Sequence, residues 1–399
     1  MIKTSEELIF KDNEIIAKIP EMVGHSAEEI LFIDIETTGL SAKTASLYMI
    51  GVAYCEKGHW RSCQMFAENT AQEAELLREF INFVKDFKVL VHFNGNRFDI
   101  PFLKSKFEKY LFEDPTDKLD SFDIYKKIAP YKNLLGLPDC KQKTIELYLG
   151  IDRQDQYDGG KLIPVYQRYT ESKDAEDLKL LLLHNEEDIK GLFELLPMLV
   201  YEDFFSRFRN LPKLSIRTDE EIDASRYYED DFALHLPVKA RKVQANYYND
   251  FEGKQKKEVY MKLSLPITLP SSLTGNYDDC YFKAEGSEAT LRVPLFEEEL
   301  KYFYANYKDY YYLPKEDTAI HKSIASFVDK AYREKATAEN CYTRKEGQYL
   351  KEWDLVFTPF FKRDYEDEDL YFDLNENMKK SRFAMSLYAC HVIAHILDA

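Results

Sequence analysis

Two acidic residues, Asp34 and Glu36, stand two positions apart at the end of an apolar run, in the stretch Leu31-Phe-Ile-Asp-Ile-Glu-Thr-Thr-Gly39. Residues i and i+2 of a β-strand point to the same face, about 7 Å apart along the backbone, so both carboxylates reach one spot. Two like charges held that close raise each other's pKa unless a cation lies between them. Hard divalent cations such as Mg²⁺ or Mn²⁺ suit oxygen ligands, which predicts a metal site here. The alternative is that Asp34 caps a turn and Glu36 is solvated.

Further acidic residues lie where other elements are expected to end or turn inward. Asp99 follows an apolar strand and a turn, at the start of a helix, where an Asp is either a cap or a third ligand. On a long predicted helix, His184 and Asp188 are four positions apart and therefore share one face. Leucines of the apolar stripe flank this pair, so we expect it to point partly inward.

Hydrophobic periodicity predicts the elements that must position these side chains. The expected elements are strands over residues 31–38, 45–55, 60–67 and 88–95 and helices over residues 71–87 and 174–199. Three adjacent strands followed by alternating helix and strand are typical of a mixed sheet with helices packed on it. This α/β region is followed by a different texture.

After Pro212 the chain consists of β-like segments broken by Pro and polar turns, with helices predicted over residues 318–335 and 376–398. We predict three parts, namely an α/β domain at 28–200, a linker at 203–228 and a C-terminal α+β domain of unknown role at 229–399. In the last helix His391 and His395 are four apart, a spacing that can bind metal, although the sequence shows no third ligand nearby.

Composition narrows the class of protein. With 399 residues, of which 45% are hydrophobic, the chain can bury a large core. The net charge of −17 argues against broad non-specific adhesion to nucleic acid, but it leaves room for a local basic groove. The amino terminus lacks the order of a secretory signal, and no stretch approaches the roughly 18 apolar residues of a membrane span, so we expect a cytoplasmic protein.

The acidic residues of the α/β region resemble the motifs of the DEDD superfamily of exonucleases, whose domain has a ribonuclease-H-like fold. The three motifs match as Phe32-Ile-Asp34-Ile-Glu36-Thr-Thr-Gly39, Asn94-Gly-Asn-Arg-Phe98-Asp99 and His184-Asn185-Glu-Glu-Asp188. Residues 137–150 also resemble the segment between the second and third motifs of bacterial YprB-like proteins. The resemblance spans about residues 28–200 and implies a ribonuclease-H-like mixed sheet flanked by helices.

The resemblance also implies a mechanism. In this superfamily two divalent ions, Mg²⁺ or Mn²⁺, lie between the carboxylates and cleave a phosphodiester bond. Asp34 would bridge both ions, Glu36 and Asp188 would complete the first site, and Asp99 would hold the second. The implied activity is that of a 3′ to 5′ exonuclease on DNA or RNA, with a single-stranded substrate or one with a 3′ end. The alternative is a catalytically inactive scaffold that binds nucleic acid or protein.

One departure from the family pattern concerns His184, because these enzymes carry either Tyr four residues before the final Asp or His five residues before it. His184 stands at the tyrosine spacing, and residue 183 is Leu. It either orients or deprotonates the attacking water, or it is a helix residue bonded to the backbone. Candidates for contacts to the substrate or to the metal ligands are Thr37, Asn94, Asn185 and Asp123.

Overall fold

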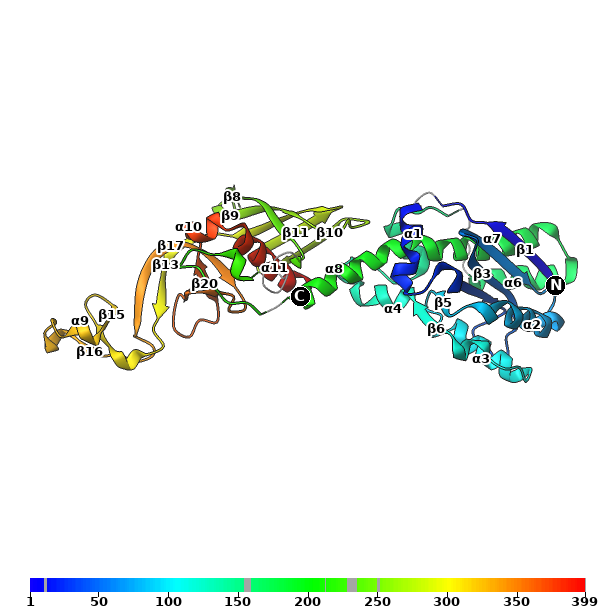
Figure 1. Cartoon of the computed structure of the whole chain (residues 1–399), viewed down its shortest axis with the longest axis horizontal. Helices are drawn as coiled ribbons and strands as arrows, with labels where there is room; N and C mark the ends of the chain where they lie inside the picture. The colour runs from blue at the N-terminus through cyan, green and yellow to red at the C-terminus, as the bar shows by residue number, and fades with distance from the viewer. Residues whose placement is uncertain (11–12, 154–158, 212, 228–234, 250–251, 399) are drawn as a thin grey trace. The chain divides into compact units, whose positions relative to one another are not determined.

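The computed structural model describes residues 1–10, 13–153, 159–211, 213–227, 235–249 and 252–398. The chain divides into two compact units, Met1–Glu202 and Asp203–Ala399, and the boundary falls within helix α8 (Leu199–Arg209) (Figure 1). In the described part of the chain, no helix combines the length and apolar character needed to cross a membrane.

The first unit is built on one six-stranded mixed sheet in the order β1-β4-β3-β2-β5-β6. The strands are β1 (Ile2–Glu7), β2 (Ile30–Thr37), β3 (Leu47–Glu56), β4 (His59–Phe66), β5 (Val89–His92) and β6 (Asp120–Asp123). Strands β1 to β4 pair antiparallel, whereas β2, β5 and β6 pair in parallel. The predicted mixed sheet is therefore confirmed, and the parallel strands place the ends of β2 and β5 at the same edge.

Helices cover both faces of this sheet. The helices of the unit are α1 (Asn13–Val23), α2 (Glu73–Phe83), α3 (Asp99–Lys109), α4 (Ile124–Ile128), α5 (Gln142–Tyr148), α6 (Gly159–Ser172) and α7 (Ala175–Glu194). One apolar core joins the sheet to α2 and α3 through buried residues such as Leu76, Phe80 and Phe102. A second core joins the other face to α6 and α7 through Tyr48, Tyr166 and Leu181.

The second unit contains a five-stranded antiparallel sheet in the order β10-β11-β12-β9-β8 and three smaller sheets. Its strands are β7 (Ile216–Arg217), β8 (Lys239–Asn249), β9 (Gln255–Ser264), β10 (Leu273–Tyr277), β11 (Cys280–Glu285), β12 (Glu288–Pro294), β13 (Phe296–Phe303), β14 (Tyr310–Leu313), β15 (Thr318–His321), β16 (Glu334–Lys335), β17 (Tyr342–Glu352), β18 (Phe357–Thr358), β19 (Phe360–Phe361) and β20 (Leu370–Asp373). Its helices beyond α8 are α9 (Lys322–Ala325), α10 (Glu376–Lys380) and α11 (Arg382–Asp398). Helix α11 packs on the five-stranded sheet, where Ser386 Oγ accepts the Ala240 N–H at 2.8 Å.

The structure corrects one predicted helix in this unit. Residues 318–335 are not a continuous helix, because β15 pairs with β14 and β16 pairs with β14 on its other side. Pairing with the neighbouring strand β14 overrides the local helical pattern, which survives in the short helix α9 and in one 3-10 turn, Lys330–Tyr332. The helix predicted at 376–398 is present as α10 and α11.

The stretch predicted as a linker carries regular structure in its described residues. Residues 203–209 continue α8, and β7 pairs in parallel with β18, with Thr218 N–H bonded to Thr358 O at 2.7 Å. Likewise β1 and α1 precede the predicted start of the α/β domain at residue 28 and belong to the first unit.

Candidate metal and nuclease site

The alternation of β2 sends its two carboxylates to the face of the sheet that α7 covers. Leu31, Ile33 and Ile35 point the other way, into the core beneath α2 and α3. Phe32, on the same face as the carboxylates, stacks on Phe193 of α7 with ring centroids 4.0 Å apart. Because side chains of a strand alternate, Asp34 and Glu36 must face α7 as well.

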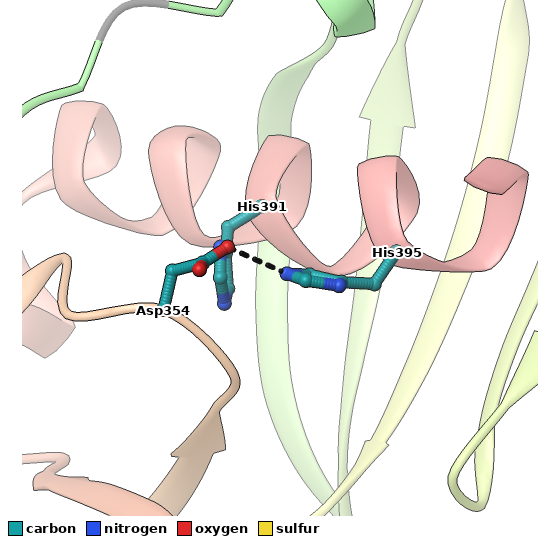
Figure 2. A group of neighbouring side chains, drawn as sticks. All are labelled: Asp354, His391 and His395. Carbon is teal, nitrogen blue, oxygen red and sulfur yellow. Dashed lines mark hydrogen bonds and ion pairs between the residues drawn. The ribbon is translucent and has the colours of Figure 1, made fainter. Parts of the chain in front are cut away.

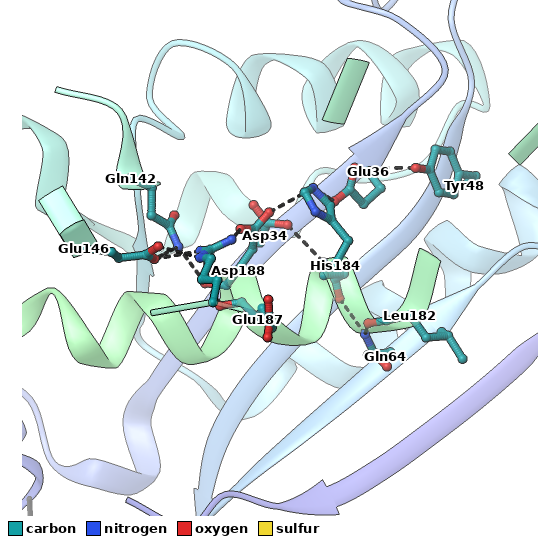
Figure 3. Close-up of polar contacts among 12 residues, drawn as sticks. Asp34, Glu36, Tyr48, Gln64, Gln142, Glu146, Leu182, His184, Glu187 and Asp188 are labelled. Atoms are coloured by element: carbon teal, nitrogen blue, oxygen red, sulfur yellow. Dashed lines mark hydrogen bonds and ion pairs between the residues drawn. The ribbon is translucent and has the colours of Figure 1, made fainter. Parts of the chain in front are cut away.

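Helix α7 presents polar side chains on the face that lies toward Asp34 and Glu36. His184 Nε2 lies 3.4 Å from Glu36 Oε1 and 3.3 Å from Asp188 Oδ2, so the imidazole bridges the carboxylates of two elements (Figure 3). His184 is only 3% exposed. Its position at the tyrosine spacing therefore brings it into the site, one helical turn before Asp188.

Asp99 enters the same site from the end of β5. It is the first residue of α3, but the N-cap position belongs to Phe98, so Asp99 is not the cap of this helix. The carboxyl is 6% exposed and faces the cavity lined by Asp34, Glu36 and Asp188. We call these four residues, Asp34, Glu36, Asp99 and Asp188, the carboxylate cluster. Together they line one cavity of about 830 Å³.

Burial and mutual repulsion raise the pKa values of three acids of this cluster. Burial, followed by repulsion from Asp188, Glu36 and Asp99, raises the pKa of Asp34 well above its ordinary range. Burial also raises the pKa of Glu36 to about 8, although the nearby His184 opposes this shift. The pKa of Asp99 rises to about 7, mainly through burial. Carboxyls that bind protons so readily lie where a cation would be favoured.

The donor set fits a hard divalent cation. Carboxylate oxygens are the ligands that Mg²⁺ and Mn²⁺ prefer, and Glu36, His184 and Asp188 each offer a ligand atom within 4.8 Å of the others. A cation among these groups would remove the repulsion that raises the pKa values of the acids. The chemistry of the residues thus agrees with the divalent ions that the resemblance implies.

A salt-bridge network holds Asp188, and two of its members, Arg153 and Glu146, do not line the cavity. Arg153 Nη1 contacts Asp188 Oδ1 at 2.5 Å, and the same guanidinium is bound by Glu146, which is 1% exposed. Gln142 Nε2 donates to Glu146 Oε1 at 3.1 Å and to the Asp188 carbonyl at 3.0 Å. One oxygen of Asp188 is therefore anchored by Arg153, while the other faces His184. A Cβ at Gly191 would lie 2.3 Å from Glu146 Oε1, so only glycine leaves space for this network.

Asn185 supports Asp34 in a comparable way. It is fully buried, donates from Nδ2 to Asp34 Oδ2 at 2.9 Å, and accepts from Gln64 Nε2 at 3.1 Å. Gly51 pairs with Asp34 across the β2–β3 ladder, and a Cβ there would lie 2.1 Å from Asn185 Oδ1. Asn185 does not line the cavity, and its contact is to Asp34, one of the predicted metal ligands.

The other candidates for substrate contacts lie at the cavity or just behind it. Thr37 lines the cavity and donates from Oγ1 to Gly39 O at 2.9 Å. Asn94 also lines it, adopts φ +59, and donates its backbone N–H to Asp123 Oδ1 at 2.9 Å. Asp123 is buried and thus holds the turn rather than facing solvent. Aromatic rings form part of the wall, contributed by Phe93, Phe98 and Tyr125.

The sequence did not identify four residues that support the site, namely Arg153, Glu146, Gln64 and Tyr48. The hydroxyl of Tyr48 lies 3.5 Å from Glu36 Oε2. Only Glu146 had a signal, because it lies in the segment 137–150 that resembles YprB-like proteins. The others meet the site through tertiary packing, which no local spacing reveals.

Comparisons with known proteins agree with this fold. Residues 31–200 match the model of the RNase_H superfamily. The chain is 27% identical over 176 residues to "Uncharacterized protein YprB" of Bacillus subtilis, an alignment that covers 43% of this chain and 42% of that protein. The chain thus spans less than half the length of this relative.

Two solved structures are weakly similar to this chain. A family B DNA polymerase from the archaeon Pyrobaculum calidifontis is 15% identical with a TM-score of 0.37, covering 70% of this chain and 35% of that one. The complex of E. coli ExoI with single-stranded DNA is 10% identical with a TM-score of 0.31, covering 60% and 55%. From its topology and its match to the family model, the region of residues 31–200 is a ribonuclease-H-like domain.

Proposed function

We propose that the chain is a divalent-metal-dependent nuclease that hydrolyses phosphodiester bonds of DNA or RNA, acting as a 3′ to 5′ exonuclease. The observation that carries this proposal is the meeting of four carboxylates from β2, α3 and α7 around one cavity. Three of them have pKa values raised by burial and mutual repulsion, which a cation would relieve. The 3′ to 5′ polarity and the use of two ions rest on the resemblance to the DEDD exonucleases.

The residues that would hold Mg²⁺ or Mn²⁺ are Asp34, Glu36, Asp99 and Asp188. When bound, such ions activate water and stabilise the leaving oxygen of a phosphodiester. Asn185 fixes one oxygen of Asp34, and Arg153 fixes one oxygen of Asp188, so both carboxylates are oriented before substrate arrives. His184 lies between Glu36 and Asp188, where its imidazole would be placed to orient the attacking water or to accept a proton from it.

The cavity wall supports a nucleic acid as the substrate. Phe93 and Tyr125 meet edge to face with centroids 5.7 Å apart, and Arg97 lies 5.7 Å from the Tyr125 ring centroid. Lys141 also lines the cavity, and its side chain is largely exposed. Aromatic faces stack on bases and cations meet phosphates, a combination that holds single strands without reading their sequence.

The test is digestion of single-stranded DNA and RNA oligonucleotides, each labelled at the 5′ end, in the presence of Mn²⁺. A 3′ to 5′ exonuclease converts such a substrate stepwise into shorter labelled products, whereas a circular single strand stays intact. Asp34→Ala is the blank, and Glu176→Gln, an exposed acid on the same helix as Asp188, is the matched control that should keep full activity. Chelation of the cation should reduce the wild-type rate to that of the blank.

A wild-type rate equal to that of Asp34→Ala on both DNA and RNA would contradict the proposal. If the protein then still bound the oligonucleotides, the scaffold alternative would be supported. Cleavage of the circular strand would retain the nuclease and reject the exonuclease.

A further inference from the structure

The second unit gathers three potential metal ligands at one end of α11. His391 and His395 are one helical turn apart, and both rings point toward Asp354 in the loop between β17 and β18 (Figure 2). His395 Nε2 lies 3.1 Å from Asp354 Oδ2. Each of the three residues offers one ligand atom, and these atoms all lie within 4.8 Å of one another. We call Asp354, His391 and His395 the histidine cluster.

We propose that the histidine cluster is a binding site for a transition-metal cation of the Zn²⁺ type, which joins α11 to the β17–β18 loop. Two imidazoles and one carboxylate form the donor set that Zn²⁺, Co²⁺ and Ni²⁺ accept, and such three-ligand sites leave further positions open to water. Ligands bonded to one tetrahedral zinc at about 2.1 Å lie roughly 3.4 Å apart. The 3.1 Å between His395 Nε2 and Asp354 Oδ2 is close to this value, and the Asp354 side chain, 75% exposed, has room to move.

The loop that carries Asp354 is held in place on both sides. The buried carboxyl of Glu352 accepts the backbone N–H groups of Val356 at 3.1 Å and Phe357 at 2.9 Å, which closes the loop around Asp354. On the other side, Trp353 donates its indole N–H to Asp278 Oδ2 at 3.1 Å. A ligand on a loop fixed in this way loses little conformational freedom when a cation binds.

His391 is the buried ligand of the histidine cluster, with only 7% of its surface exposed. Its Nε2 accepts the backbone N–H of Trp353 at 3.2 Å. A cation bound at Nε2 must displace this hydrogen bond, which lowers the affinity of the site for the cation. The Trp353 ring lies 5.7 Å from the His391 ring and 5.3 Å from the His395 ring, so its fluorescence reports on the cluster.

The site differs from the carboxylate cluster in the cation it selects. Oxygen ligands favour Mg²⁺ and Mn²⁺, whereas imidazoles favour Zn²⁺, Co²⁺ and Ni²⁺. Calorimetric titration of the full chain with Zn²⁺ in an excess of Mg²⁺ therefore tests the histidine cluster while the oxygen ligands are occupied. We expect one equivalent of Zn²⁺ to bind, and Co²⁺ to quench the fluorescence of Trp353.

The variants His395→Gln and Asp354→Asn change partly or largely exposed side chains and should leave the fold intact. Each should weaken Zn²⁺ binding at least about tenfold and reduce the Co²⁺ quenching. The matched controls are His25→Gln and Asp120→Asn, which change a His–Asp pair with the same 3.1 Å separation but no second histidine. His184→Gln reports any Zn²⁺ that binds at the carboxylate cluster.

Two results would overturn the proposal. One is Zn²⁺ binding of equal stoichiometry and affinity in wild type, His395→Gln and Asp354→Asn, including no binding in any of them. The other is loss of the Zn²⁺ signal in His184→Gln with retention in His395→Gln. Neither result bears on the nuclease assay, so the two proposals fail independently.

Discussion

The carboxylate cluster and the histidine cluster start from similar local spacings and reach different chemistry. The first combines an i, i+2 pair on β2 with an i, i+4 pair on α7, and burial raises the pKa values of three of its four acids, Asp34, Glu36 and Asp99. The second has an i, i+4 pair of imidazoles on α11 and a single, largely exposed acid. The excess negative charge and the oxygen ligands of the carboxylate cluster favour hard cations such as Mg²⁺ and Mn²⁺. The two imidazoles of the histidine cluster favour a softer cation such as Zn²⁺.

The clusters also differ in how their ligands are held. Asp34 and Asp188 are each fixed by a hydrogen-bond donor that lies behind them, Asn185 and Arg153 respectively. Among the residues that the structure describes, Asp354 has no side-chain donor from outside the histidine cluster. Its loop is held instead by the backbone hydrogen bonds to Glu352. The first cluster is thus organised side chain by side chain, and the second through its backbone.

The largest expected effect is the loss of nuclease activity in Asp99→Asn and Asp188→Asn. Each change removes one negative charge and one cation ligand while keeping the shape of the side chain. We expect the rate of oligonucleotide digestion with Mn²⁺ to fall by more than about 100-fold. Removal of a residue that only hydrogen-bonds to a metal ligand costs up to roughly 100-fold, and removal of the ligand itself should cost more. Asp117→Asn, an exposed acid paired with Lys104, is the control. Full activity in either site variant would show that the nuclease does not need that residue as a cation ligand.

Glu352 offers a test of the second unit, because burial raises its pKa to about 8, the same value as for Glu36. Its Oε1 has no hydrogen-bond partner among the described residues. A carboxyl with a raised pKa in the folded state stabilises the fold below its unfolded pKa near 4.5, and this contribution is lost as the pH rises through about 8. We expect the second unit to lose a few kcal/mol of stability across this window.

Glu352→Gln should remove this pH dependence, which differential scanning calorimetry at several pH values would detect. Glu366→Gln, a change at an exposed acid of the same unit, should leave the dependence unchanged. Mn²⁺ should not alter it either, because Glu352 belongs to neither cluster. An unfolding profile of the second unit that is flat between pH 4.5 and about 8 in wild type would contradict the raised pKa.

Arg153→Ala should raise the Mn²⁺ concentration that gives half-maximal nuclease activity by about 10- to 100-fold, because Arg153 orients Asp188 without lining the cavity. The half-saturating Mn²⁺ concentration should rise more than the maximal rate falls, which separates positioning from catalysis. Arg168→Ala removes another arginine–aspartate pair that involves the same helix α7, the bridge to Asp177, and should have no such effect. Equal Mn²⁺ dependence in the two variants would show that Arg153 does not position Asp188.

Much of the first unit could be predicted from the sequence, because its strands and helices have clear periodicity and its acids lie at their ends. The mixed sheet and the inward face of α7 follow from local pattern, whereas the ribonuclease-H-like character of the sheet follows from the resemblance of the three acidic motifs. The contacts of Arg153 and Asn185 could not be predicted, because they depend on which distant segments meet. Asp354 illustrates the same limit: the spacing of His391 and His395 was visible, but the loop that completes the cluster is placed by the end of β17.

The smallest expected effect comes from Gly51→Ala. The added methyl would lie 2.1 Å from Asn185 Oδ1, and Asn185 has no room to retreat because it is fully buried between Gln64 and Asp34. We expect a loss of about 1–2 kcal/mol in the free energy of unfolding, as for other overpacked sites, together with reduced activity.

A double-mutant cycle with Asn185→Ala measures the source of this loss. Once the Asn185 amide is removed, the methyl group added at position 51 has space, so the Gly51→Ala change should cost little stability in the Asn185→Ala background. The activity should nevertheless stay low in the double variant, because Asp34 has lost the donor that orients it. Additive costs in stability would mean that the glycine is required by the β2–β3 ladder itself and not by the support of Asp34.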